Sequence, residues 1–140
     1  MTKETGRQIV QHLEQEFSGL IESLKDLVRS VPTEHVYILR SAAVVEQTCG
    51  GLTSNLWDDP FEWTLPETLS NPERIVEYLS EVDATRQRAF SSIEDDSALT
   101  KIISTPSGER LLISLLLDTL VRAAEYKGKA LDRIQKMVQD

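Results

Sequence analysis

Cysteine and histidine are scarce in this sequence, and both shortages restrict its chemistry. Cys49 is the single cysteine among 140 residues, so the chain can form neither an internal disulfide nor a cysteine-based zinc cluster. The two histidines, His12 and His35, do not have the spacing of a metal-ligand pair. One thiol fits a reducing compartment, and the first residues, MTKETGRQ, lack the apolar core of a signal peptide. We therefore expect a cytoplasmic protein.

Turn residues, long apolar runs and basic charge are also in short supply. Six glycines and five prolines are too few for a β-sandwich, which needs a turn every ~8–12 residues. The longest apolar run, Leu111–Leu117, is interrupted by Ser114 and falls far short of the ~20 residues that span a bilayer. Because 23 acidic residues outnumber 15 basic ones, the formal charge is -8. We therefore expect neither a membrane nor a nucleic acid as partner.

Helical periodicity is the strongest positive signal. Apolar residues recur every three or four positions in four segments, which are Thr5–Arg29, Thr33–Trp57, Asn71–Ile93 and Glu109–Val138. Asn71 and Pro72 supply a capping side chain and a proline suited to the first helical position. The sequence predicts an all-α fold, a four-helix bundle in which residues 1–140 form one domain.

The connections between these helices carry further predictions. Trp57–Ser70 is a long link with three large aromatic rings, so we expect a crossover that covers one end of the bundle and buries an indole. It suggests that the second and third helices run in the same direction, with a simple up-and-down bundle as the alternative. Gly50-Gly51 predicts a kink or a close backbone approach. Ser97–Ile103 is expected to form a short helical turn, and Thr105–Gly108 a loop.

The last helix divides into two faces in its second half. One face is apolar and we expect it to point inward, with Gly128 allowing a neighbouring helix to come close; it consists of Leu120, Ala124, Gly128, Leu131, Ile134 and Val138. The other face is polar and consists of Asp118, Arg122, Tyr126, Lys129 and Arg133, with Glu125 beside it.

A Leu-rich helix that continues as Arg122-Ala-Ala-Glu-Tyr-Lys-Gly-Lys129 resembles the last helix of the DinB/YfiT-like superfamily. The element order and the long Trp57–Ser70 link resemble that superfamily too. The resemblance implies a four-helix bundle with a long crossover between helices two and three. It also implies a divalent metal held by three histidines, two from the last helix and one from helix two.

The histidines of that motif are replaced here. If Gly128 matches the family glycine, the two ligand positions of the last helix are Arg122 and Tyr126, and the position in helix two falls at about Ser41. Arginine has no acceptor, and a tyrosine hydroxyl titrates near ~10, so neither replaces imidazole. The resemblance thus implies a degenerate metal site and no resident cofactor.

Other catalytic chemistries find little support in the sequence. No glutamate has a histidine three residues later, which excludes the di-iron motif of helix bundles. A looser set, Glu46, Asp118 and Glu125, could hold a hard divalent cation weakly; alternatively these acids pair with Arg40, Arg122 and Lys129 on a solvated surface. Cys49 falls on an apolar helix face and is expected to be buried and inert.

Two functional hypotheses follow. In the first, a metal-free DinB-like bundle acts as a small-ligand-binding or protein-interaction module, with a homodimer through an apolar helix face as a candidate assembly. Its cleft would be lined by Ser41, Glu46, Asp118, Arg122, Glu125 and Tyr126, where Arg122 would clamp a carboxylate and Tyr126 would donate a hydrogen bond. In the alternative, the chain is a divalent-metal-dependent transferase or hydrolase, similar to thiol-transferring relatives, that uses nonstandard ligands.

Overall fold

The computed structural model describes residues 5–30, 35–55, 57 and 72–139, and side chains only as far as residue 136. Its long helices are α1 (Gln8–Ser30), α2 (Val36–Ser54), α5 (Pro72–Ser91) and α6 (Leu112–Gln139). Shorter elements are the 3-10 helices η1 (Thr5–Arg7) and η2 (Asp96–Thr100) and the strands β1 (Ile102–Thr105) and β2 (Gly108–Leu111). Within these residues the predicted helical fold is confirmed, with a small sheet added.

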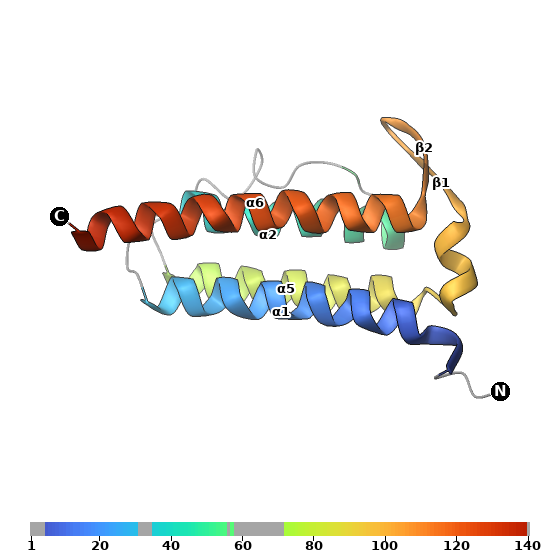
Figure 1. Cartoon of the computed structure of the whole chain (residues 1–140), viewed down its shortest axis with the longest axis horizontal. Helices are drawn as coiled ribbons and strands as arrows, with labels where there is room; N and C mark the ends of the chain where they lie inside the picture. The colour runs from blue at the N-terminus through green and yellow to red at the C-terminus, as the bar shows by residue number, and fades with distance from the viewer. Residues whose placement is uncertain (1–4, 31–34, 56, 58–71, 140) are drawn as a thin grey trace.

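The four helices form two layers, α2 with α6 and α1 with α5 (Figure 1). The layers meet mainly where α2 packs on α5. Figure 1 shows that α2 and α5 run in the same direction, so the end of α2 and the start of α5 lie at opposite ends of the bundle. The crossover expected between the second and third helices is confirmed in that sense. The link itself, apart from Trp57, lies outside the described residues, as do Phe61 and Trp63.

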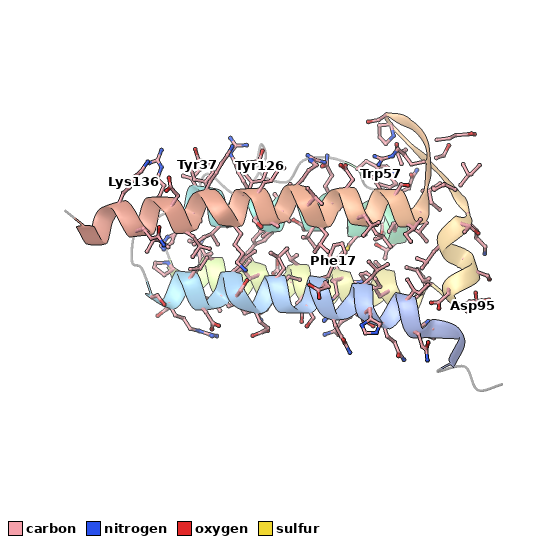
Figure 2. The ribbon with its side chains drawn as sticks, in the orientation of Figure 1. Phe17, Tyr37, Trp57, Asp95, Tyr126 and Lys136 are labelled. Carbon is pink, nitrogen blue, oxygen red and sulfur yellow. The ribbon has the colours of Figure 1, made fainter. Side chains whose placement is uncertain are left out.

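Helix α1 forms where the sequence pattern predicted it. The apolar seam turns toward the other helices and is buried at Val10, Leu13, Phe17, Leu20, Ile21, Leu24 and Val28. Phe17 lies between the two layers (Figure 2), with its ring centroid 5.3 Å from that of Phe90 on α5. Each large apolar side chain buried in this way contributes roughly 1.5–3 kcal/mol. Ile9, near the start of the same helix, is 50% exposed.

The first turn of α1 is held by a residue far along the chain. The carboxylate of Asp96 accepts hydrogen bonds from the backbone N–H groups of Ile9 at 3.2 Å and Val10 at 3.0 Å. Arg7 in turn donates to the backbone oxygens of Ile93 and Glu94. Asp96 therefore satisfies two N–H groups that lack partners within the helix, and its charge suits the positive end of the helix dipole.

Helix α2 passes through the Gly50-Gly51 pair and ends at Ser54, because Asn55 adopts a left-handed conformation with φ of 56°. The close approach expected at these glycines involves a side chain and not a second backbone. A Cβ at Gly51 would lie 2.3 Å from the indole of Trp57, so this position needs glycine. Trp57 is half-buried, its indole N–H donates to Asn55, and Gln47 donates to its backbone oxygen.

A β-hairpin precedes the last helix, which corrects two predictions. The predicted helical turn is present as η2 but ends at Thr100, so residues 102–103 belong to β1, and α6 begins at Leu112 and not near Glu109. The strands pair antiparallel, with Ile102 opposite Leu111 and Thr105 opposite Gly108. Gly108 has a φ of 117°, which glycine adopts without strain. The loop expected at Thr105–Gly108 is thus the tight turn of this hairpin, and pairing keeps residues 108–111 out of the helix.

The inward face of α6 also differs from the prediction. Ala123 and Ala130 are fully buried, whereas Ala124 and Gly128 are exposed and Leu131 is 40% exposed. A Cβ at Gly128 would meet no heavy atom of the described residues within 4 Å, so the expectation that a neighbouring helix comes close there is wrong. The buried Ala123 and Ala130 and the exposed Ala124 and Gly128 are all small residues, so periodicity alone does not decide which of them face the bundle.

Candidate functional site

The interface between α2 and α6 contains buried hydroxyl groups that bridge the two helices. The Ser41 hydroxyl donates to the backbone oxygen of Ala123 at 2.7 Å, and the hydroxyls of Thr48 and Thr119 lie 2.6 Å apart. Ser41 is 0% exposed, so it lies in a closed helix contact and not in an open cleft. Throughout the described residues, every buried side-chain nitrogen or oxygen has a hydrogen-bond partner. These groups fix the register of the two helices.

Glu46 lies on another side of α2, toward α5. Its carboxylate accepts a hydrogen bond from the hydroxyl of Tyr78. Burial raises the pKa of Glu46 above its ordinary value, the hydrogen bond from Tyr78 opposes that rise, and the nearby charge of Glu81 adds to it. Glu46 therefore does not face the α6 residues with which the sequence analysis grouped it.

Asp118 and Arg122 lie on the exposed surface of α6. Asp118 forms an ion pair with Arg110 of β2, with 3.8 Å between the charged atoms, in place of the intrahelical pair with Arg122 suggested by their spacing. Among the described residues, no three carboxylate, histidine or cysteine side chains come together as a metal-binding group. The set of Glu46, Asp118 and Glu125 is thus not brought together, because Glu46 faces α5 while Asp118 and Glu125 lie on the exposed surface of α6. His12 is exposed on α1, and His35 is buried just before α2.

Glu125 lines a groove on the outer side of the α2–α6 layer, and Tyr126 stacks on Tyr37, another residue of that lining. The rings of Tyr126 and Tyr37 are stacked, with centroids 6.4 Å apart and 21° between their planes, and both project away from α1 and α5 (Figure 2). The ammonium of Lys129 lies 5.4 Å from the Tyr126 centroid and 5.7 Å from that of Tyr37, within cation–π range. The groove has a volume of about 590 Å³ and is lined by Tyr37, Glu125, Gly128, Lys129, Asp132 and Arg133.

Tyr37 was not among the sequence-predicted site residues, although a signal for it exists. It precedes Ser41 by four residues, which places both on one side of α2 and toward α6. Arg133 was assigned only to the polar face of the last helix; its guanidinium carbon lies 5.5 Å from the Tyr37 centroid. The structure therefore brings Glu125 and Tyr126 together with residues that the predicted cleft did not include.

An apolar stripe runs along the exposed side of α6 beside this groove. We call Leu117, Val121, Ala124, Gly128 and Leu131 the α6 stripe; all five residues are exposed. Leu117 is 45% exposed and Val121 56%, which is unusual for large aliphatic residues that line up on one helix face. Single exposed apolar residues are ordinary, but a continuous exposed patch marks an interaction surface.

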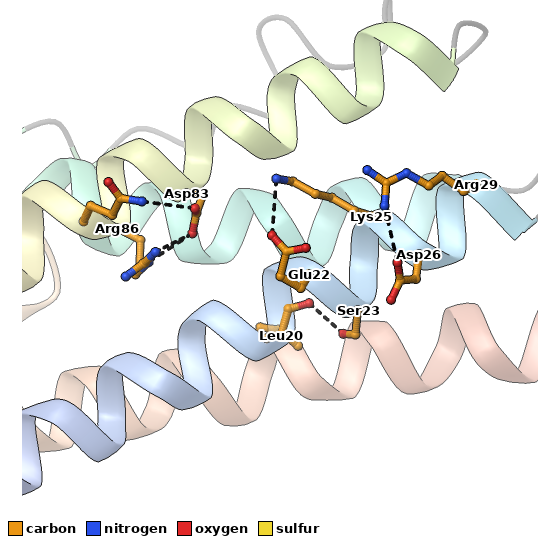
Figure 3. Close-up of polar contacts among 9 residues, drawn as sticks. Leu20, Glu22, Ser23, Lys25, Asp26, Arg29, Asp83 and Arg86 are labelled. Atoms are coloured by element: carbon orange, nitrogen blue, oxygen red, sulfur yellow. Dashed lines mark hydrogen bonds and ion pairs between the residues drawn. The ribbon is translucent and has the colours of Figure 1, made fainter.

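Two reactive-looking groups lie elsewhere in the interior. Cys49 is 0% exposed, and burial raises the pKa of its thiol to about 12, so it remains protonated and unreactive at neutral pH. Arg86 on α5 forms ion pairs with Glu14 on α1 and with Asp83 (Figure 3 shows the contact with Asp83). Sequence analysis missed Arg86, although it follows Val82 and precedes Phe90 by four residues each on the buried side of α5.

The described helices provide no segment that is both long enough and apolar enough to cross a membrane. Taken together, the arrangement offers surface chemistry: an apolar stripe, a groove with two tyrosine rings, and charged residues between them. Comparison of the chain with protein-family models, with curated proteins and with solved structures gave no match.

Proposed function

We propose that this chain is a protein-interaction module that binds its partner through the outer side of α6, and that it is a DinB-like bundle without the metal triad of that superfamily. The observation that carries the proposal is the exposure of the α6 stripe. Leu117, Val121 and Leu131 are between 40% and 56% exposed on a helix of 28 residues. Covering them with a partner removes apolar surface from water, at roughly 25 cal/mol for each Å².

The positions that correspond to the family's ligands support a role without a metal. Ser41 uses its hydroxyl for the backbone of Ala123. Arg122 is exposed, and its guanidinium has no free lone pair with which to ligate a metal. Tyr126 stacks on Tyr37 beneath the ammonium of Lys129. None of these three side chains offers a ligand of the kind that the family's imidazoles provide, which disfavours the metal-dependent transferase or hydrolase.

The groove beside the stripe extends the same surface. Gly128 belongs to both features, and Lys129 follows it in the groove. A partner that covers the stripe therefore also reaches the ring pair of Tyr37 and Tyr126, which can supply the aromatic contacts and hydroxyl hydrogen bonds common at protein interfaces.

Site-specific photocrosslinking tests this proposal. Val121 is replaced by p-benzoylphenylalanine in the cells that produce the chain, and adducts are identified by mass spectrometry after irradiation. The same residue in place of Asp26, whose side chain is 74% exposed on α1, serves as the matched control. We expect a discrete protein adduct from position 121 and none from position 26. No adduct, or equal labelling at both positions, would exclude an interaction through the stripe.

A further inference from the structure

The α6 stripe has the spacing of a helix seam. Its five residues are separated by four, three, four and three positions, the pattern with which one helix packs along another. Their sizes are uneven along the seam, because Ala124 and Gly128 are small and Leu117 and Val121 are large. Among the described residues, a Cβ at Gly128 would meet nothing within 4 Å, which leaves room for a side chain from outside.

A row of alternating charges runs alongside the stripe. We call it the α6 charged row; all six members are exposed, and they are Asp118, Arg122, Glu125, Lys129, Asp132 and Lys136. Acid and base follow each other at every step. Such a row repels a copy of itself in some registers and attracts one in others, so it selects the orientation of a partner.

We propose that the partner on the α6 stripe is a second copy of this chain, bound antiparallel about a two-fold axis near Ala123. The inference rests on the interaction role proposed above and names its occupant. In this arrangement Leu117 lies over the partner's Gly128, and Val121 lies against the partner's Ala124. Each of these two contacts combines a large with a small side chain, and the two-fold symmetry repeats both of them, as an interface between identical chains requires.

The same arrangement pairs the charges. With the helices reversed, Asp118 lies opposite the partner's Lys129, and Arg122 lies opposite the partner's Glu125. A parallel arrangement in register would instead place Gly128 on Gly128 and leave a gap, while Leu117 would meet Leu117. Exposed ion pairs add little affinity, so in this interface they set the orientation of the partner, and the contacts between apolar side chains supply the attraction.

The seam extends over about 21 Å of helix, which makes a small interface and a dimer that dissociates on dilution. Sedimentation equilibrium over a range of concentrations therefore measures its dissociation constant. The first variant is Gly128→Gln, because it fills the space for the partner's Leu117 and its Cβ meets no heavy atom of the described residues within 4 Å. Gly19→Gln is the matched control, since Gly19 is an exposed helical glycine on α1 that also has nothing within 4 Å.

We expect the unchanged chain and Gly19→Gln to dimerise alike, and Gly128→Gln to weaken dimerisation at least ten-fold while its helical circular dichroism is retained. A chain that stays monomeric at every concentration, or a Gly128→Gln variant that dimerises as tightly as the control, would overturn the proposal. If position 121 still crosslinks specifically to a different protein, the interaction role stands and only the identity of the partner fails.

A charge reversal tests the orientation. Arg122→Glu places two acids together across the proposed interface, and we expect weaker dimerisation. Arg122→Glu combined with Glu125→Arg restores opposite charges at both symmetric contacts, so the dissociation constant should return to near its original value. If the double variant is as weak as the single one or weaker, the antiparallel pairing is refuted.

Discussion

Replacing Arg86 tests how much the interior of this bundle depends on one charged group. Its side chain is 8% exposed, and its guanidinium contacts Glu14 at 2.8 Å and Asp83 at 2.7 Å. Arg86→Met keeps much of the volume but removes the positive charge. The carboxylates of Glu14 and Asp83, whose side chains are 30% and 20% exposed, then lose their common partner in a poorly solvated region.

Breaking a buried ion pair in this way costs about 3–5 kcal/mol, a large part of the roughly 5–15 kcal/mol that stabilises a domain. Because both acids keep some access to water, we expect the lower end, about 3 kcal/mol. Urea unfolding followed by circular dichroism gives the free energy of unfolding for the variant and for the unchanged chain. Combining Arg86→Met with Glu14→Gln and Asp83→Asn removes the orphaned charges and should recover most of the loss.

Arg29→Met is the matched control, because Arg29 also pairs with an acid three residues away, at 3.4 Å, but its side chain is 60% exposed. That pair should contribute less than ~0.5 kcal/mol. A loss of under ~1 kcal/mol for Arg86→Met would refute the reasoning, since it would mean that Glu14 and Asp83 are solvated well enough without their partner.

Three further predictions concern other polar groups. Burial raises the pKa of Glu46 above its ordinary value of 4.5, so the folded state favours the protonated carboxyl. The contribution of this group to the free energy of unfolding is therefore fully present below pH 4.5 and is lost as the pH rises through the folded-state pKa. Glu46→Gln should therefore increase the unfolding free energy at pH 7, and this gain should shrink as the pH falls toward 4.5. Urea titrations at both pH values measure the gain, and a variant less stable than the unchanged chain at pH 7 would contradict the prediction. Asp96→Ala removes the hydrogen-bond acceptor for the N–H groups of Ile9 and Val10 and should lower the unfolding free energy by about 1 kcal/mol, with Asp96→Asn lowering it less. Faster amide hydrogen exchange at Ile9 and Val10 would confirm the cause, and unchanged exchange would count against it. Because the described residues bring together no three metal-binding side chains, purified protein should carry less than one equivalent of transition metal by elemental analysis, and one tightly bound equivalent would disprove this.

The helices were predictable because each buries an apolar face with a regular period. The seam of α1 from Val10 to Val28 and the proline that opens α5 are local signals, and the structure uses both. These features depend on sequence within one segment, which is where pattern reasoning is strongest. The long link suggested that α2 and α5 run in the same direction but left an up-and-down bundle as the alternative, and the structure has the parallel arrangement.

The candidate site was harder to predict because it depends on how a helix is rotated. In α6 the buried Ala123 and the exposed Ala124 are neighbours, and both are plausible at a helix contact. The inward assignment was wrong for Ala124, Gly128 and Leu131, which are exposed, whereas Leu120 of the same predicted face does pack against the core. The β-hairpin was missed because Ile102 and Ile103 also fit a short helix, and only pairing with residues 108–111 distinguishes the two.

The predicted cleft contained residues from different sides of the bundle. Glu46 turns toward Tyr78 on α5, and Ser41 is enclosed by α6. Sequence spacing gives the order of residues around one helix but not which neighbour each side of that helix meets. Of the predicted cleft residues, only Glu125 lines the groove, and Tyr126 adjoins it by stacking on Tyr37.

The contact between Asp96 and the start of α1 bears on the order of assembly during synthesis. Residues 8–10 are synthesised long before residue 96. The opening turn of the first helix therefore lacks the Asp96 carboxylate until more than two thirds of the chain has been made. Nascent chains that stop at Ser91 should therefore have a frayed leading turn, and extension through η2 should close it.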